Sequence, residues 1–293
     1  MDIESKKFLG QPKNFVSIFN ALLFDGQPVL KPEYLKDENN ELVMNVSSKH
    51  VDIIKRYEDG TYLDLFVIES QSYVDPSMVA RVMEYESVAR MRYIRQNFKK
   101  HVPMHTRLPM ILTVVLYVGE SKWNAAKRLS ELEIIHPGFE DMFNEFKLNL
   151  IELNTNHKYN TGEKATQDFF DLLRMIYRKQ ILKENLDREF NRDALYFAYV
   201  VTKNKELLNI YQESEKGDVK VCRALDEMFE ESTNKGIQMG IKQGIEQGVE
   251  RGVKNTQIKI AIKMLVRNNQ TLEEISEIVG LDLDALRELK NNI

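Results

Sequence analysis

Cysteine is almost absent from this chain of 293 residues, in which Cys222 stands alone. A single thiol excludes an internal disulfide bond and a cysteine-rich zinc site, so a reducing, cytoplasmic location is expected. No apolar run approaches the roughly 18 residues that span a membrane, and the N-terminal residues lack the pattern of a signal peptide. A basic excess is missing too, because the net charge is −4. Any binding of nucleic acid must therefore depend on a local patch of charge.

The patterns of residues 1–158 predict an α/β domain. Apolar residues at helical spacing alternate with short runs rich in β-branched residues, and Asp59–Gly60 separates two such runs in the manner of a hairpin turn. "LPMILTVVLYVG" is apolar without alternation, which is typical of a strand buried on both faces. The expected order is helix 14–24, strands 49–57 and 61–71, helix 76 to about 100, and strands 108–119 and 147–153.

The remainder of the chain has helical patterns throughout. We expect a helical subdomain over residues 159–232, a glycine-repeat helix over 233–254 and a tail of short helices over 255–293. In the tail, "TLEE" predicts a capping box and Gly280 suits a helix end. The tail resembles a helix-turn-helix, but its excess of acids favours packing against protein over binding to DNA.

The hairpin carries the residues best suited to chemistry. With the turn at Asp59–Gly60, Asp52 is expected opposite Val67, on the face that Glu69 and Gln71 share. Two carboxylates brought together can hold Mg²⁺, and the Gln71 amide could orient an attacking water. The alternative is that these acids are ordinary strand-end residues, which face solvent or pair with Lys and Arg.

Here the sequence resembles the PD-(D/E)XK nuclease superfamily, specifically the recombination-promoting nuclease (Rpn) or transposase-like proteins. The residues that carry the resemblance are "VDII", "VIESQS", "DPSMVARVMEYE" and "LPMILTVVLYVGESKW". The resemblance implies an α-β-β-β-α-β core with a mixed sheet flanked by helices, and cleavage of DNA that depends on Mg²⁺, with Mn²⁺ as an alternative. It also implies that Asp52 and Glu69 bind the metal. Gln71 stands where the superfamily signature has lysine, and glutamine at that position is common in these relatives.

The helix after this motif is the clearest basic segment. Residues 90–107 hold six Lys or Arg and no acid. We expect Arg81, Arg92, Arg95 and Lys99 to share one helical face and to contact phosphates, with Arg81 nearest to the catalytic residues. The alternative is a solvated face whose cations favour the helix C-terminus.

Five glycines recur at every fourth position from Gly236 to Gly252, each followed by Ile or Val. Such a row of small residues lets two helices approach closely, so we expect a homodimer through residues 236–253 or docking on the helical subdomain. A flexible spacer is the alternative.

The leading hypothesis is a cytoplasmic, metal-dependent DNA endonuclease that acts in recombination or on mobile or phage-related DNA. One alternative is a catalytically weak nucleic-acid-binding or scaffold protein with the same fold. The other is a nuclease for RNA.

Overall fold

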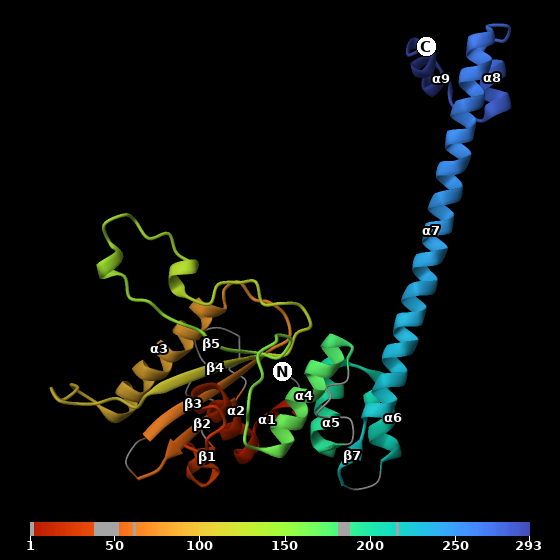
Figure 1. Ribbon diagram of the computed structural model, residues 1–293. Helices are drawn as coiled ribbons and strands as arrows, with labels where there is room; N and C mark the ends of the chain where they lie inside the picture. The colour runs from red at the N-terminus through yellow and green to blue at the C-terminus, as the bar shows by residue number, and fades with distance from the viewer. Residues whose placement is uncertain (1–2, 38–52, 61–62, 181–187, 215–216) are drawn as a thin grey trace. The chain divides into compact units, whose positions relative to one another are not determined.

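The structure is a computed structural model (Figure 1), and it describes residues 3–37, 53–60, 63–180, 188–214 and 217–293. The chain forms two compact units, residues 1–227 and residues 228–293. The boundary predicted near residue 158 lies inside the first unit, whereas the glycine repeat and the tail belong to the second.

A five-stranded mixed sheet forms the centre of the first unit. The spatial order follows the sequence, with β1, β2 and β3 antiparallel and β3, β4 and β5 parallel. This arrangement confirms the predicted α/β class with a mixed sheet flanked by helices. The strands are β1 (Leu35–Asp37), β2 (Ile53–Glu58), β3 (Leu63–Gln71), β4 (Ile111–Tyr117) and β5 (Asn149–Glu152).

The hairpin of β2 and β3 forms where it was predicted, but its register differs by two residues. Val67 lies opposite Ile54, and Glu58 with Leu63 is the pair nearest the turn among the described residues. The predicted pairing of Asp52 with Val67 is therefore wrong. A shift of two residues leaves every side chain on its predicted face. Asp52 itself lies outside the described residues.

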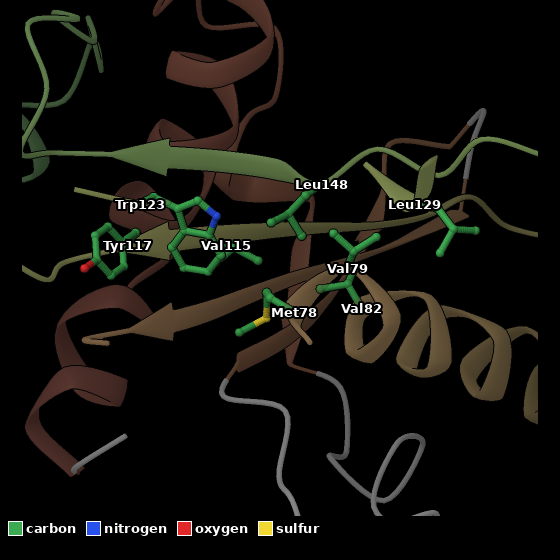
Figure 2. Packing of buried hydrophobic residues seen from close by; sticks show 8 residues of the cluster. All are labelled: Met78, Val79, Val82, Val115, Tyr117, Trp123, Leu129 and Leu148. Atoms are coloured by element: carbon green, nitrogen blue, oxygen red, sulfur yellow. The ribbon is translucent and has the colours of Figure 1, made fainter. Parts of the chain in front are cut away.

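Helix α3 (Met78–Asn97) covers one face of the sheet. Met78, Val79 and Val82 point from it toward Val115 of β4 and enclose a buried apolar cluster (Figure 2). The opposite face packs against α2 (Pro12–Phe24), where the rings of Phe19 and Phe66 lie 4.8 Å apart. The apolar faces of α3 and α2 thus cover the two faces of the sheet, and β3 and β4 are buried on both sides.

Both ends of α3 differ from the prediction. The helix begins after Ser77, because the Asp75 carboxylate accepts the backbone N–H of Ser77 in a turn that precedes the first helical residue. At the other end Phe98 takes an extended conformation, so the helix stops at Asn97. Lys99 therefore lies beyond the helix, and the expectation that it continues the face of Arg92 and Arg95 is wrong.

The helical region after β5 packs with the N-terminal helix α1 (Ile3–Leu9). The ring of Phe8 stacks on Phe197 at 4.7 Å, and Phe197 lies 4.4 Å from Phe169. This aromatic cluster places the region in the same unit as the sheet. A two-residue antiparallel pair, β6 (Glu189–Phe190) with β7 (Val219–Lys220), was not predicted. The helices are α4 (Lys164–Arg178), α5 (Arg192–Thr202) and α6 (Lys205–Glu213). The 3₁₀ turns in the first unit are η1 (Pro32–Tyr34), η3 (Leu129–Glu131) and η4 (Glu140–Met142).

The glycine repeat lies in the long helix α7 (Cys222–Arg267), and two short helices follow it, α8 (Leu272–Val279) and α9 (Leu283–Asn291). The capping box at Thr271 and Glu274 is present, and Gly280 has the predicted left-handed conformation with φ 74°. Ala261, Ile275, Val279 and Leu286 are buried together in a small core. In the described part of the chain, no helix combines the length and the apolar character needed to cross a membrane.

The five glycines of the repeat occupy exposed positions on α7. A Cβ atom added to any of them would meet nothing within 4 Å. The β-branched residues that follow them are also exposed, from Val253 at 52% to Ile245 at 61%.

Candidate active site

The candidate site lies at the carboxyl end of β3, on the face of the sheet that α3 covers. Glu69 and Gln71 alternate with residues of the opposite face and therefore share this face, in register with Val115 and Tyr117 of the parallel strand β4. Glu69 is 3% exposed and Gln71 is 5% exposed. A carboxylate and an amide are thus enclosed at the end of a strand whose other residues are mostly apolar.

A buried carboxylate is costly unless a cation compensates for it. For Glu69 that cation is Arg81 of α3, whose Nη2 donates to Oε1 at 3.0 Å. The same guanidinium donates to Asp75 at 2.6 Å and to the hydroxyl of Tyr85 at 2.8 Å and 3.1 Å. Arg81 therefore links the strand end to the start and the first turns of the helix.

The ionisation of these groups follows from the network. Burial by itself would raise the pKa of Asp75, but hydrogen bonds from Ser77 and Arg81 bring that pKa below its ordinary value. Burial opposes the charged guanidinium of Arg81, yet bonding to Asp75 and Tyr85 raises its pKa overall. Both groups are consequently charged at neutral pH. Burial also raises the pKa of Tyr85, which remains a neutral hydroxyl.

The backbone of Gln71 is hydrogen-bonded, whereas the N–H groups of its side-chain amide have no acceptor among the described residues. The backbone carbonyl accepts the N–H of Val118 at 2.8 Å. Among the described residues, the buried Nε2 atom has no hydrogen-bond partner. Buried donors of this kind are rare and usually face a water, an ion or a ligand. The amide is therefore suited to donate to a group that enters the site.

Gly119 allows the chain to pass close to the ends of these strands. A Cβ atom at this position would lie 2.4 Å from the hydroxyl oxygen of Tyr117 and 2.6 Å from the carbonyl oxygen of Ser72. Such distances are shorter than any real contact, so only glycine fits between the ends of β3 and β4.

The structure separates the residues predicted to bind phosphate. Arg81 donates to two carboxylates and a hydroxyl of the protein, whereas it was expected to contact phosphate. Arg92 is half-buried and Arg95 exposed further along α3, and Lys99 is exposed beyond the helix end. Arg95 is fourteen residues from Arg81, which corresponds to about 21 Å along a helix. Their contacts with nucleic acid stay predictions.

The bond between Asp75 and Arg81 was not predicted from the sequence. The available signal was an acid placed six residues before an arginine at a helix start, which does not by itself fix their distance.

In the described part of the chain, no cluster of three or more His, Cys, Asp or Glu has the arrangement of a metal site. Asp52, the second predicted carboxylate ligand, lies outside that part.

The chain was compared with known proteins. A family model described as "Putative transposase, YhgA-like" matches residues 42–206, which is more than half of the chain and includes β2 to β5 and α3. Neither a search of curated proteins nor one of solved structures finds a match.

The network predicts a large difference between two arginines on one helix. The Arg81 side chain is 14% exposed and faces carboxylates that are 4% and 13% exposed. Arg81→Met leaves these buried charges uncompensated and should lower the free energy of unfolding by about 3–5 kcal/mol. Arg95→Met removes an exposed cation from the same helix and should change it by less than about 0.5 kcal/mol. Urea unfolding measures both, and equal effects would contradict the assigned role of Arg81.

Proposed function

The chain belongs to the family described as "Putative transposase, YhgA-like", and on that premise we propose that it is a Mg²⁺-dependent endonuclease that cleaves DNA. Family membership supports chemistry related to transposition. The finer assignment depends on the enclosed Glu69 carboxylate, which Arg81 keeps ionised beside the spare donor of Gln71.

The residues present suit a hard divalent cation. Carboxylate oxygens are the ligands that Mg²⁺ prefers, and Glu69 offers a charged carboxylate at the strand end. Asp52, expected from the sequence as the second ligand, directly precedes the first residue of β2, which pairs with Ile68 next to Glu69. When bound, such a cation polarises a phosphoryl oxygen and lowers the pKa of a coordinated water.

The protein's own groups would have three tasks. Arg81 keeps Glu69 charged and fixes the orientation of its carboxylate through Oε1. Gln71 donates from Nε2 to the oxygen of the attacking water and so holds it in place. Arg92, Arg95 and Lys99 would meet the sugar-phosphate backbone outside this enclosed region. An amide stabilises transition-state charge less than a lysine does, so slow turnover is expected.

The proposal is tested by nicking of supercoiled plasmid. Wild type should nick DNA only when Mg²⁺ or Mn²⁺ is present, and a chelator should stop the reaction. Glu69→Gln keeps the shape of the side chain but removes its charge, and activity should fall to background. Glu84→Gln is the matched control, because Glu84 is exposed on α3, and it should keep full activity. Circular dichroism verifies that both variants are folded.

Three results would contradict the assignment. Full metal-dependent nicking by Glu69→Gln would remove Glu69 from catalysis. Binding of DNA without cleavage by wild type, at any metal concentration tested, would favour a binding or scaffold protein. Cleavage of matched RNA in preference to DNA would turn the proposal toward a ribonuclease.

We also propose that two copies of the chain associate through the glycine row of α7. The glycines follow an i, i+4 line and have open space above them, while Ile and Val stand exposed at their side. Rows of this kind interdigitate when two helices cross at about −50°. Burial of the exposed β-branched side chains would supply the driving force.

Replacement of the small residues tests this interface. Gly244→Leu with Gly248→Leu fills the row, keeps the helix and should convert a dimer into a monomer in analytical ultracentrifugation. Lys242→Leu with Glu246→Leu is the control, because positions two residues beyond a glycine lie about 200° around the helix. The control also leaves the net charge unchanged. A glycine variant that sediments like wild type contradicts the proposed interface.

A further inference from the structure

Polar side chains continue from the candidate site across the ends of two further strands. Gln71 of β3 lies opposite Tyr117 of β4, and Tyr117 lies opposite Glu152 of β5. Paired residues of parallel strands point to the same side of the sheet. Glu152 therefore lies on the same face as Glu69 and Gln71, two strands away.

Glu152 is a buried carboxylate whose bonding is incomplete. The residue is 8% exposed, and its Oε1 atom accepts from the ammonium of Lys127. The Oε2 atom is buried and has no hydrogen-bond partner among the described residues. A buried carboxylate that serves only stability normally has its remaining lone pairs satisfied. The Oε2 atom of Glu152 can therefore still accept a hydrogen bond from a water or another donor.

Lys127 presents its charge at the edge of this face. Its backbone is fixed, because its N–H donates to Glu131 at 2.7 Å and its carbonyl accepts the N–H of Leu148 at 2.9 Å. The side chain is nevertheless 46% exposed, so the ammonium can use its remaining N–H groups toward a ligand. A rigid backbone with an exposed cationic tip is a suitable arrangement for an anion contact.

Neither Arg81 nor Gln71 supplies such a cation at the candidate active site. Arg81 is already bonded to Glu69, Asp75 and Tyr85, and Gln71 carries no charge. We infer that Lys127 contacts a phosphate of the DNA strand held at the site, and that Glu152 positions Lys127 and moderates its charge. This inference rests on the proposed function. Two strand spacings amount to roughly 9–10 Å, so Lys127 would meet a neighbouring phosphate and not the one that is cleaved.

Binding of a short fluorescent DNA duplex, measured by anisotropy in metal-free buffer over a series of salt concentrations, tests the inference. Loss of one phosphate contact should lower the slope of log K against log salt by about one in Lys127→Ala. Lys122→Ala is the matched control, because Lys122 is an exposed lysine of the same loop, and it should keep the wild-type slope.

Glu152→Gln should change the affinity for DNA in the opposite direction. Glu152 contacts the phosphate-binding ammonium directly, so removal of its negative charge also removes a repulsion toward the phosphate and should strengthen binding severalfold. The gain should vanish in the double variant Lys127→Ala with Glu152→Gln, which should bind like Lys127→Ala. If the ion pair only stabilised the loop, substitution of Lys127 and substitution of Glu152 would not change the affinity for DNA in opposite directions.

The possible failures are distinguishable. An unchanged slope in Lys127→Ala, or weaker binding by Glu152→Gln, overturns the phosphate contact and leaves the nuclease proposal intact. Absence of DNA binding by wild type at low salt overturns both. The expected slopes in a protein that does not nick plasmid would uphold the Lys127 contact and contradict only the endonuclease assignment.

Discussion

The bond between Arg81 and Glu69 is the interaction on which the candidate site depends. A carboxylate that is 3% exposed would be neutral or destabilising without a compensating charge. Arg81 supplies that charge from the helix that covers the sheet, and Asp75 and Tyr85 hold the guanidinium in turn. The result is an acid that is paired with a cation and held in a fixed orientation at the end of β3. A fixed orientation is the preorganisation that suits a ligand of a divalent cation.

The order of the sheet determines what can surround this acid. Because β3, β4 and β5 are parallel, their carboxyl ends lie side by side, and residues in register share one face. Glu69, Gln71 and Glu152 are therefore presented to the same side, although they come from strands that are far apart in the sequence. Met78, Val79 and Val82 of α3 pack toward Val115 on that face (Figure 2). Gln71 and Glu152 lie at the carboxyl ends of their strands, beyond these apolar contacts.

Much of this fold could be predicted from local patterns. Alternation in "VIESQ" placed Glu69 and Gln71 on one face, and the mainly apolar run 111–117 became the interior strand β4. The register of the hairpin could not be predicted, because the Asp-Gly signal does not fix how many residues the connection uses. The hydrogen-bond partners of Arg81 could not be predicted from the sequence either. Helical spacing aligned it with Arg92 and Arg95, whereas its actual neighbours are set by how α3 meets the sheet. Lys127 and Glu152 meet only through a folded loop, and no spacing in the sequence joins them.

The central claim is that Glu69 is kept charged to bind a divalent cation. Electron paramagnetic resonance of free Mn²⁺, titrated into the metal-free protein without DNA, measures this directly. Wild type and Glu84→Gln should both withdraw Mn²⁺ from solution with the same saturable affinity, and Glu69→Gln should lose that binding while it stays folded. Undiminished Mn²⁺ binding by Glu69→Gln would contradict the account, because the carboxylate that Arg81 holds in place would then have no part in binding the cation.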